Sequence, residues 1–245
     1  MLHRLLLLPL APALIVEGRW VRARTPRLPE PDGAREGICG DGPDLRLLII
    51  GDSAAAGVGA PTQDEALAGQ VSRKLGDHYR VHWHLEALTG RRIDDYLPPN
   101  DPLPAFEPDA ILISIGVNDV TSSVSAASWL GKVGQLLERL RDRYRPALIL
   151  FTDVPPMDHF PALPQPLRWY LGRRAREFNN GLGPLLRGRR DVTRVSVLFE
   201  NDPAVMARDG FHPGPEGYRV WANEVRSLVR SRLRDRQTTP PSITL

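Results

Sequence analysis

The chain has 245 residues, of which 42% are hydrophobic and 25% charged, a composition typical of one globular domain with an extension. Its single cysteine, Cys39, excludes an intramolecular disulfide and leaves no cysteine cluster for a structural metal. The net charge of +3 comes from arginines scattered along the chain without a compact basic patch, which argues against a nucleic-acid partner.

The N-terminus carries a short apolar segment followed by arginines. The apolar run from Leu5 to Val16 is too short to span a bilayer and is interrupted by two prolines. No small-x-small cleavage site follows it, and the arginines that begin at Arg19 favour retention of this flank in the cytoplasm. We therefore expect residues 1–24 to form an uncleaved anchor at a membrane surface. A cleaved signal, which would give a periplasmic protein, and a cytoplasmic location are the alternatives.

From Leu45 onward, short apolar runs alternate with segments of helical periodicity, which predicts βαβ units around a parallel sheet. The five predicted strands are Leu45–Ile50, Arg80–Ala87, Asp109–Ile115, Ala147–Phe151 and Val192–Val197. The amphipathic helices are predicted over Ala126–Tyr144, Leu167–Leu186 and Pro215–Arg234. The chain thus divides into an apolar segment with a Pro/Arg-rich linker (1–44), one α/β domain (45–235) and a tail (236–245).

The stretch "LRLLIIGDSAAAGVGA" places Asp52 and Ser53 directly after the first predicted strand. Ligands of parallel α/β sheets gather beyond the carboxyl ends of strands, so Ser53 could act on a ligand or could merely cap the next helix. The stretch lacks the lysine of a P-loop, the third glycine of a dinucleotide fingerprint and the second glycine of a nucleophile elbow. These three motifs are therefore excluded.

Other polar groups fall at the same predicted edge of the sheet. Gly90 follows the second strand, and Asn118 follows the third in "GVND". In "DGFH", Asp209 precedes His212 by three residues, a spacing at which the carboxylate can accept the imidazole Nδ1–H and leave Nε2 free as a base. Each feature alone is common in turns, but together they indicate one site.

Four blocks, in order, resemble the SGNH hydrolase superfamily, also known as GDSL esterases and lipases. They are "GDSAAAG" (51–57), the glycine of "LTG" (88–90), "GVND" (116–119) and "DGFH" (209–212). The last, within "DGFHPGPEGYRVWA", resembles the bacterial lysophospholipase-like esterases in particular. The resemblance implies a flavodoxin-like three-layer α/β/α sandwich with a central five-stranded parallel sheet.

The same resemblance implies a role for each residue of the site. Ser53 would be the nucleophile, His212 the base and Asp209 the carboxylate that orients it. The oxyanion hole would comprise the N–H groups of Ser53 and Gly90 with the side-chain amide of Asn118. Asp52 is expected to be a structural partner of its loop.

Four further residues are candidates for substrate binding. Arg91 and Arg92 stand in the second block where many members of the superfamily have a small residue and a threonine, which alters the expected shape and charge of the cleft. His159 and Phe160 follow the fourth predicted strand, where they could line an acyl pocket or belong to a mobile loop.

The predicted function is that of a serine hydrolase that cleaves carboxylic esters or thioesters, of acyl or lysophospholipid type, through an acyl-enzyme, with no cofactor and no metal. His82 and His84 share one strand face, but no third ligand lies near them in the sequence, which favours ordinary packing. The alternatives are a carbohydrate O-acetylesterase and a non-catalytic binding module on the same fold. The presence of Ser53, Asn118 and His212 argues against the binding module.

Overall fold

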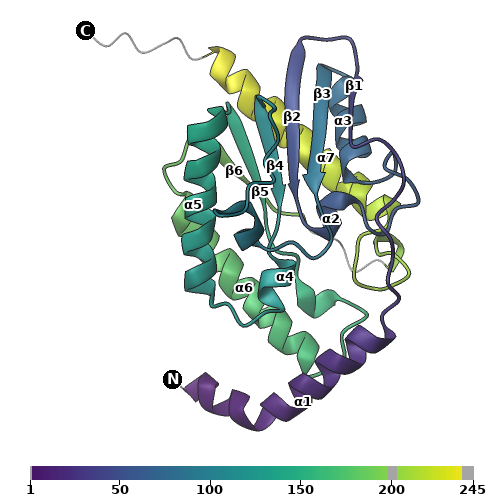
Figure 1. Ribbon diagram of the computed structural model, residues 1–245, viewed down its shortest axis with the longest axis vertical. Coiled ribbons are helices and arrows are strands. Elements are labelled where there is room, and N and C mark those ends of the chain that lie inside the picture. Colours follow the sequence, from purple (N-terminus) through teal and green to yellow (C-terminus); the bar gives the residue numbers. More distant parts are fainter. Residues whose placement is uncertain (1, 198–202, 239–245) are drawn as a thin grey trace.

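The computed structural model describes residues 2–197 and 203–238 and shows a twisted sheet between two layers of helices (Figure 1). The strands lie in the spatial order β1-β3-β2-β4-β5-β6. Their bounds are Glu36–Cys39 (β1), Asp44–Gly51 (β2), Arg80–Ala87 (β3), Ala110–Ser114 (β4), Leu148–Thr152 (β5) and Val192–Val195 (β6).

The predicted α/β/α sandwich is confirmed, with one correction to its sheet. All five predicted strands form and pair in parallel. The sheet also contains β1, which pairs antiparallel with β3 at the edge, so it is a mixed sheet of six strands. The four residues of β1 are only partly buried and include no apolar run. This strand therefore depends on the free edge of β3, which local sequence does not reveal.

The longer helices are amphipathic and cover both faces of the sheet (Figure 1). The α-helices are Leu2–Arg24 (α1), Ser53–Ala56 (α2), Leu67–Gly76 (α3), Val117–Val120 (α4), Ala126–Tyr144 (α5), Leu167–Leu186 (α6) and Pro215–Thr238 (α7). Short 3₁₀ turns occur at Ile93–Tyr96 (η1), Met157–His159 (η2) and Pro203–Val205 (η3). Because α7 continues to Thr238, the predicted tail begins inside a helix, and residues 239–245 lie outside the described residues.

The core has one apolar layer on each side of β4 and β5, which are buried along their whole length. Helices α5 and α6 supply one layer, and α3 and α7 supply the other. Trp129 of α5 is fully buried, with its ring stacked on Phe178 at 4.7 Å and edge-to-face with Phe151 at 6.1 Å between centroids. These rings join α5, α6 and β5 below the carboxyl edge of the sheet.

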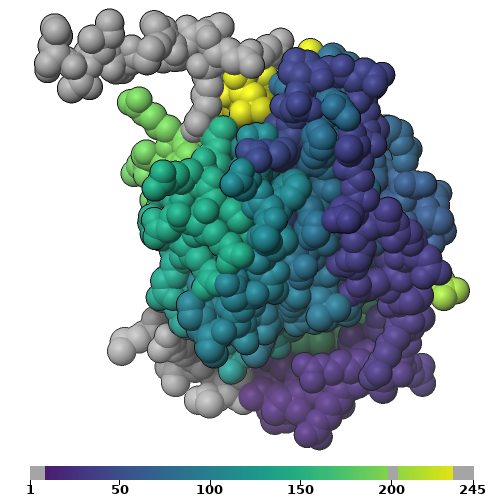
Figure 2. All heavy atoms as spheres, turned by 45° about the horizontal axis from the view of Figure 1, so that its top comes forward, coloured from purple at the N-terminus to yellow at the C-terminus, as the bar shows by residue number. Residues whose placement is uncertain are grey.

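The N-terminal helix α1 lies against α6, and the segment after it runs along the outside of the domain toward β1 (Figures 1 and 2). Leu14 and Val21 pack against the core, and the backbone N–H of Leu167 donates to Glu17 Oε2 at 2.9 Å. No helix among the described residues is both long enough and apolar enough to cross a membrane. The predicted localisation at a membrane or in the periplasm through this apolar segment is therefore wrong, because the helix docks on its own domain.

Replacing Trp129 with alanine should lower the free energy of unfolding by about 3–5 kcal/mol, since it removes a fully buried aromatic ring and leaves a cavity. Urea denaturation monitored by circular dichroism measures the change. Trp169→Ala is the matched control, because this tryptophan on α6 is 39% exposed and its loss should cost about 0.5 kcal/mol or less. Equal denaturation midpoints for the two variants would contradict the assigned packing.

Candidate active site

Ser53 is the first residue of α2, at the carboxyl end of the central strand β2. Asp52 caps this short helix, with its Oδ1 accepting from the backbone N–H of Ala54 at 3.1 Å. Ala55 and Ala56 are fully buried, so the turn packs tightly on the sheet and leaves Ser53 half-buried at the surface of the site. This arrangement confirms Asp52 as a structural partner of the loop.

Asp209, His212 and Ser53 form a continuous line of hydrogen bonds. Asp209 Oδ2 lies 2.6 Å from His212 Nδ1, and His212 Nε2 lies 2.9 Å from Ser53 Oγ. Asp209 Oδ1 also accepts from the backbone N–H groups of Phe211 and His212, each at 3.0 Å. Burial acts to raise the pKa of Asp209, but hydrogen bonds from the His212 side chain and the two amides hold it below its ordinary value. The carboxylate thus stays charged and fixes the imidazole.

Two contacts hold the loops of Ser53 and His212 together. A Cβ atom at Gly59 would lie 2.2 Å from the carbonyl oxygen of Pro213, so only glycine allows this approach. The buried hydroxyl of Tyr218, in the first turns of α7, donates to the carbonyl of Val58 at 2.6 Å. The segment after α2 therefore packs against the segment that runs from Pro213 into α7.

Gly90 lies in the loop after β3, and Asn118 lies in the short helix α4 after β4; these two strands are the neighbours of β2. Gly90 has a φ of +87°, and no atom lies within 4 Å of the position its Cβ would occupy. The Asn118 side-chain amide donates to the carbonyl of Arg91 at 2.9 Å, and Asp119 Oδ2 accepts from the N–H of Ile93 at 3.2 Å. Helix α4 therefore positions the loop that carries Gly90, while the amide of Asn118 keeps a second N–H.

Neither Arg91 nor Arg92 lines the cavity beside Ser53. The Arg91 guanidinium pairs with Glu86 Oε1 at 2.8 Å and donates to the Tyr96 hydroxyl at 3.1 Å. That hydroxyl in turn donates to the carbonyl of Gly51 at 2.8 Å, so Arg91 braces the end of β2. Arg92 lies at the start of η1, where its backbone N–H donates to a carboxylate of that turn.

His159 and Phe160 separate in the structure. His159 is exposed at the end of η2, away from the cavity lining. Phe160 is 5% exposed, lines the cavity and makes an edge-to-face contact with Phe211, their ring centroids 5.0 Å apart. Of the four residues predicted to bind substrate, Phe160 alone borders this cavity.

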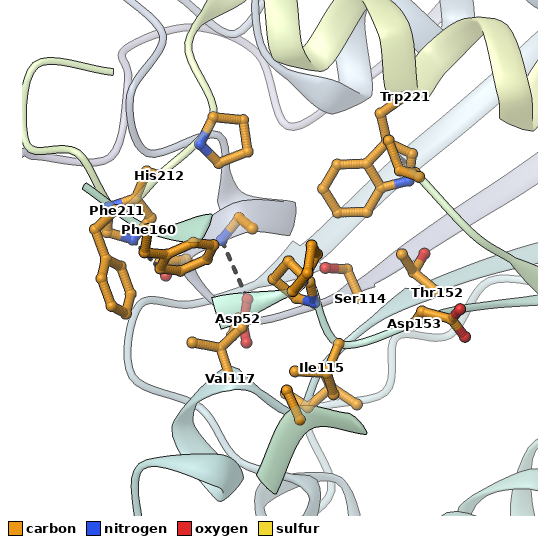
Figure 3. Close-up of a pocket in the computed structure, with 18 of the residues that line it drawn as sticks. Asp52, Ser114, Ile115, Val117, Thr152, Asp153, Phe160, Phe211, His212 and Trp221 are labelled. Carbon is orange, nitrogen blue, oxygen red and sulfur yellow. Dashed lines mark hydrogen bonds between the residues drawn. The ribbon is translucent and has the colours of Figure 1, made fainter. Parts of the chain in front are cut away.

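A cavity of about 180 Å³ extends from Ser53 and His212 over the carboxyl ends of β4 and β5 (Figure 3). The residues that form its wall include Ser114, Val117, Thr152, Val154, Phe160 and Trp221. The backbone of Val154 is fixed by Asn179, whose side chain accepts from its N–H at 2.9 Å and donates to its carbonyl at 2.7 Å. Thr152 was not predicted to line the site, although it is a hydroxyl residue at the end of an apolar strand, as Ser53 is.

Two buried carboxyls lie beside the site. Burial raises the pKa of Asp52, which is 2% exposed, to about 7, and its Oδ2 has no hydrogen-bond partner among the described residues. Burial likewise raises the pKa of Asp119 to about 6. A fraction of both carboxyls is therefore protonated near neutral pH.

Within the described ranges, no group of three or more His, Cys, Asp or Glu side chains is arranged to hold a metal ion. His82 Nε2 lies 2.9 Å from Asp44 Oδ1, and His84 Nδ1 lies 3.2 Å from Glu36 Oε2. The two histidines thus pair with carboxylates of adjacent strands.

Comparison with known proteins identifies the family to which this chain is similar. Residues 49–220 match the model of the GDSL-like lipase/acylhydrolase family. A GDSL-like esterase of Mycobacterium tuberculosis is 25% identical over 217 residues, covering 80% of this chain and 65% of the relative. The chain thus spans slightly less than two thirds of that relative's length.

Two solved structures show the same fold. A family two carbohydrate esterase from Clostridium thermocellum, in complex with cellohexaose, is 18% identical with a TM-score of 0.61, covering 79% of this chain and 66% of that chain. The psychrotrophic esterase EstA from Pseudoalteromonas sp. is 17% identical with a TM-score of 0.61, covering 78% and 99%. Since the family match covers more than half of the chain, from the end of β2 into α7, the chain belongs to the GDSL-like lipase/acylhydrolase family, as its SGNH motifs predict.

Proposed function

We propose that the protein is a serine hydrolase that cleaves carboxylic esters through an acyl-enzyme. The observation that carries this proposal is the hydrogen-bond line from Asp209 through His212 to Ser53, with Ser53 and His212 lining a cavity. A serine hydroxyl is a weak nucleophile until a base accepts its proton, and His212 Nε2 lies in position to do so. Membership of an acylhydrolase family supports the same reaction.

In the proposed reaction, Ser53 Oγ attacks the ester carbonyl carbon while His212 Nε2 accepts the hydroxyl proton. Collapse of the tetrahedral intermediate breaks the bond to the alcohol, which takes that proton and leaves. Water then attacks the acyl-enzyme, His212 again accepts a proton, and the acid is released as Ser53 regains its hydrogen. Asp209 stabilises the imidazolium that forms in each step.

The oxyanion of each intermediate would accept hydrogen bonds from the backbone N–H groups of Ser53 and Gly90 and from the Asn118 amide. Support for this assignment comes from their positions on adjacent strand ends and from the open space around Gly90. Donors held in place before the reaction stabilise charge without a reorganisation cost. The contact between Asn118 and the Arg91 carbonyl provides this rigidity.

The proposed substrates are small acyl or lysophospholipid-type esters, whose acyl group the apolar wall of the cavity would receive. A second candidate is a carbohydrate O-acetylesterase, which the likeness to the Clostridium thermocellum carbohydrate esterase favours. Both candidates use the same chemistry and differ in the acyl group that is transferred to Ser53 and in the alcohol that leaves.

Ser53→Ala should abolish turnover of 4-nitrophenyl esters while leaving the thermal unfolding transition in place, because it removes the nucleophile and no packing contact. A panel from acetate to laurate measures the activity. If the purified variant retains most of its activity, Ser53 is not the nucleophile. Absence of turnover by the unmodified protein across the whole panel would favour the binding-module alternative.

Asn118→Ala should lower kcat more than it raises KM, because the amide stabilises charge that exists only in the transition state. The expected loss is about 2.7–4 kcal/mol, on the order of a hundredfold or more in kcat. Thr121→Ala is the control, since it removes a hydrogen bond to the Asn118 carbonyl but no donor from the site. A change confined to KM would mean that Asn118 binds the ground state.

His212→Ala should remove nearly all turnover and Asp209→Asn a large part of it. His159→Ala should leave kcat within a few-fold of normal, because His159 is exposed and its neighbour Asp158 is paired with Arg176. Steady-state kinetics on one 4-nitrophenyl ester compare the three variants. A dead His159→Ala protein beside an active His212→Ala protein would show that the base is wrongly assigned.

A further inference from the structure

The three groups proposed to stabilise the oxyanion come from three separate segments of the chain. Ser53 follows β2, Gly90 lies in the loop after β3, and Asn118 lies in α4 after β4. Such donors are most effective when they already converge on one point before the reaction, so their segments must keep a fixed relative position. The hydrogen bonds around Arg91 join all three segments.

The backbone of Arg91 joins Gly90 to Asn118. Its N–H donates to the carbonyl of Leu88 at 3.2 Å, which closes a β-turn with Gly90 at the third position. The φ of Gly90 is +87°, and a positive φ at that position of a turn favours glycine. The carbonyl of Arg91 accepts from the Asn118 side-chain amide at 2.9 Å. The turn that carries the Gly90 N–H is therefore bonded directly to the Asn118 side chain.

The side chain of Arg91 reaches the strand end before Ser53 through Tyr96. Arg91 Nη1 donates to the Tyr96 hydroxyl at 3.1 Å, and the backbone N–H of Gly51 donates to the same oxygen at 2.8 Å. The hydroxyl also lies 2.8 Å from the carbonyl oxygens of Gly51 and Glu86, one of which accepts its hydrogen. Because Tyr96 is fully buried, this hydroxyl fixes the backbone two residues before the proposed nucleophile.

The Arg91 side chain is itself held in place. Its Nη1 lies 2.8 Å from Glu86 Oε1, and the side chain is only 16% exposed. A second bond joins the same turn to β2, since the N–H of Leu88 donates to the carbonyl of Gly51 at 3.3 Å. Loss of the Arg91 guanidinium would leave the Glu86 carboxylate and the Tyr96 hydroxyl each without a partner.

We propose that Arg91 and Tyr96 are positioning residues that hold the Ser53, Gly90 and Asn118 donors as one unit. Neither Arg91 nor Tyr96 lines the cavity beside Ser53, so their effect is on the alignment of the donors and not on contact with the substrate. That alignment matters most when negative charge develops on the ester oxygen. This inference rests on the proposed esterase function, since it concerns the oxyanion hole of that reaction.

Arg91→Met should lower kcat for 4-nitrophenyl butyrate about tenfold and leave KM within about twofold, because a small displacement of the donors weakens transition-state stabilisation more than substrate binding. Tyr96→Phe should act in the same direction. The bonds from the Arg91 side chain to Glu86 and Tyr96 all come from Nη1, and a lysine ammonium also carries several donors. Arg91→Lys should therefore have a kcat between those of Arg91→Met and the unmodified protein.

Two further variants separate positioning from general stability. The double variant Arg91→Met/Tyr96→Phe should lose little more kcat than the more impaired single variant, because both changes break the same line of hydrogen bonds. Arg141→Met is the matched control. Arg141 on α5 also pairs with a carboxylate, that of Asp191, and its side chain is 27% exposed. Its replacement should lower the urea denaturation midpoint and leave kcat unchanged.

The outcomes distinguish this inference from the proposed function. Normal kcat in folded Arg91→Met, or a loss confined to KM, would show that the network only stabilises the fold. Equal kcat values for Arg91→Lys and Arg91→Met, or losses that multiply in the double variant, would also overturn the proposal. If Tyr96→Phe does not fold, the comparison of Arg91→Met with Arg91→Lys decides. Absence of ester hydrolysis by the unmodified protein would instead contradict the proposed function.

Discussion

The site depends on one packing contact, in which the segment that carries Val58 and Gly59 lies against the segment from Pro213 into α7. Ser53 and His212 are 159 residues apart in sequence, and their side chains meet only because the two segments pack without a side chain between them. The hydrogen bond from Tyr218 to the Val58 carbonyl holds this contact from within the core. The geometry of the Ser53–His212 hydrogen bond is thus set by packing directly beside the two residues, since a Cβ at Gly59 would also lie 3.3 Å from His212 Cβ.

The same packing gives the site an energetic cost. Asp52 is buried so deeply that its pKa rises to about 7, far above its value in an unfolded chain. A raised carboxyl pKa means that the folded state binds a proton that the unfolded state has already lost. Asp52 therefore makes the protein less stable as pH rises from about 4 to 7, and Asp119 acts in the same direction up to about 6. The two apolar layers of the sheet offset this cost.

Local sequence was sufficient to predict the main elements of the fold. Helices α5 and α6 begin and end at the predicted residues, because a long apolar stripe fixes both their type and their extent. The parallel strands were equally clear as short apolar runs. Strand β1 was not predicted, because its four residues gain a strand conformation only through the edge of β3.

The residues of the site were predictable to different degrees. The spacing of Asp209 and His212 already implies their hydrogen bond, whereas the contact of His212 with Ser53 was expected only from the resemblance to the SGNH superfamily. The position of Arg91 could not be predicted, because its contacts with Glu86 and Tyr96 depend on how the loop folds back. The lining of the cavity was also beyond local patterns, since Thr152 of β5 and Trp221 of α7 are distant in sequence.

The most direct test of the account is to locate the nucleophile by covalent labelling. A 4-nitrophenyl alkylphosphonate should transfer one phosphonyl group to each chain and release one 4-nitrophenolate. Peptide mass spectrometry should then find the phosphonyl group on Ser53. Esterase activity should fall in proportion to labelling, because the adduct blocks Ser53 Oγ, the oxygen that His212 is proposed to activate. Full activity in quantitatively labelled protein, or an inactivating adduct on another residue, would contradict the assignment.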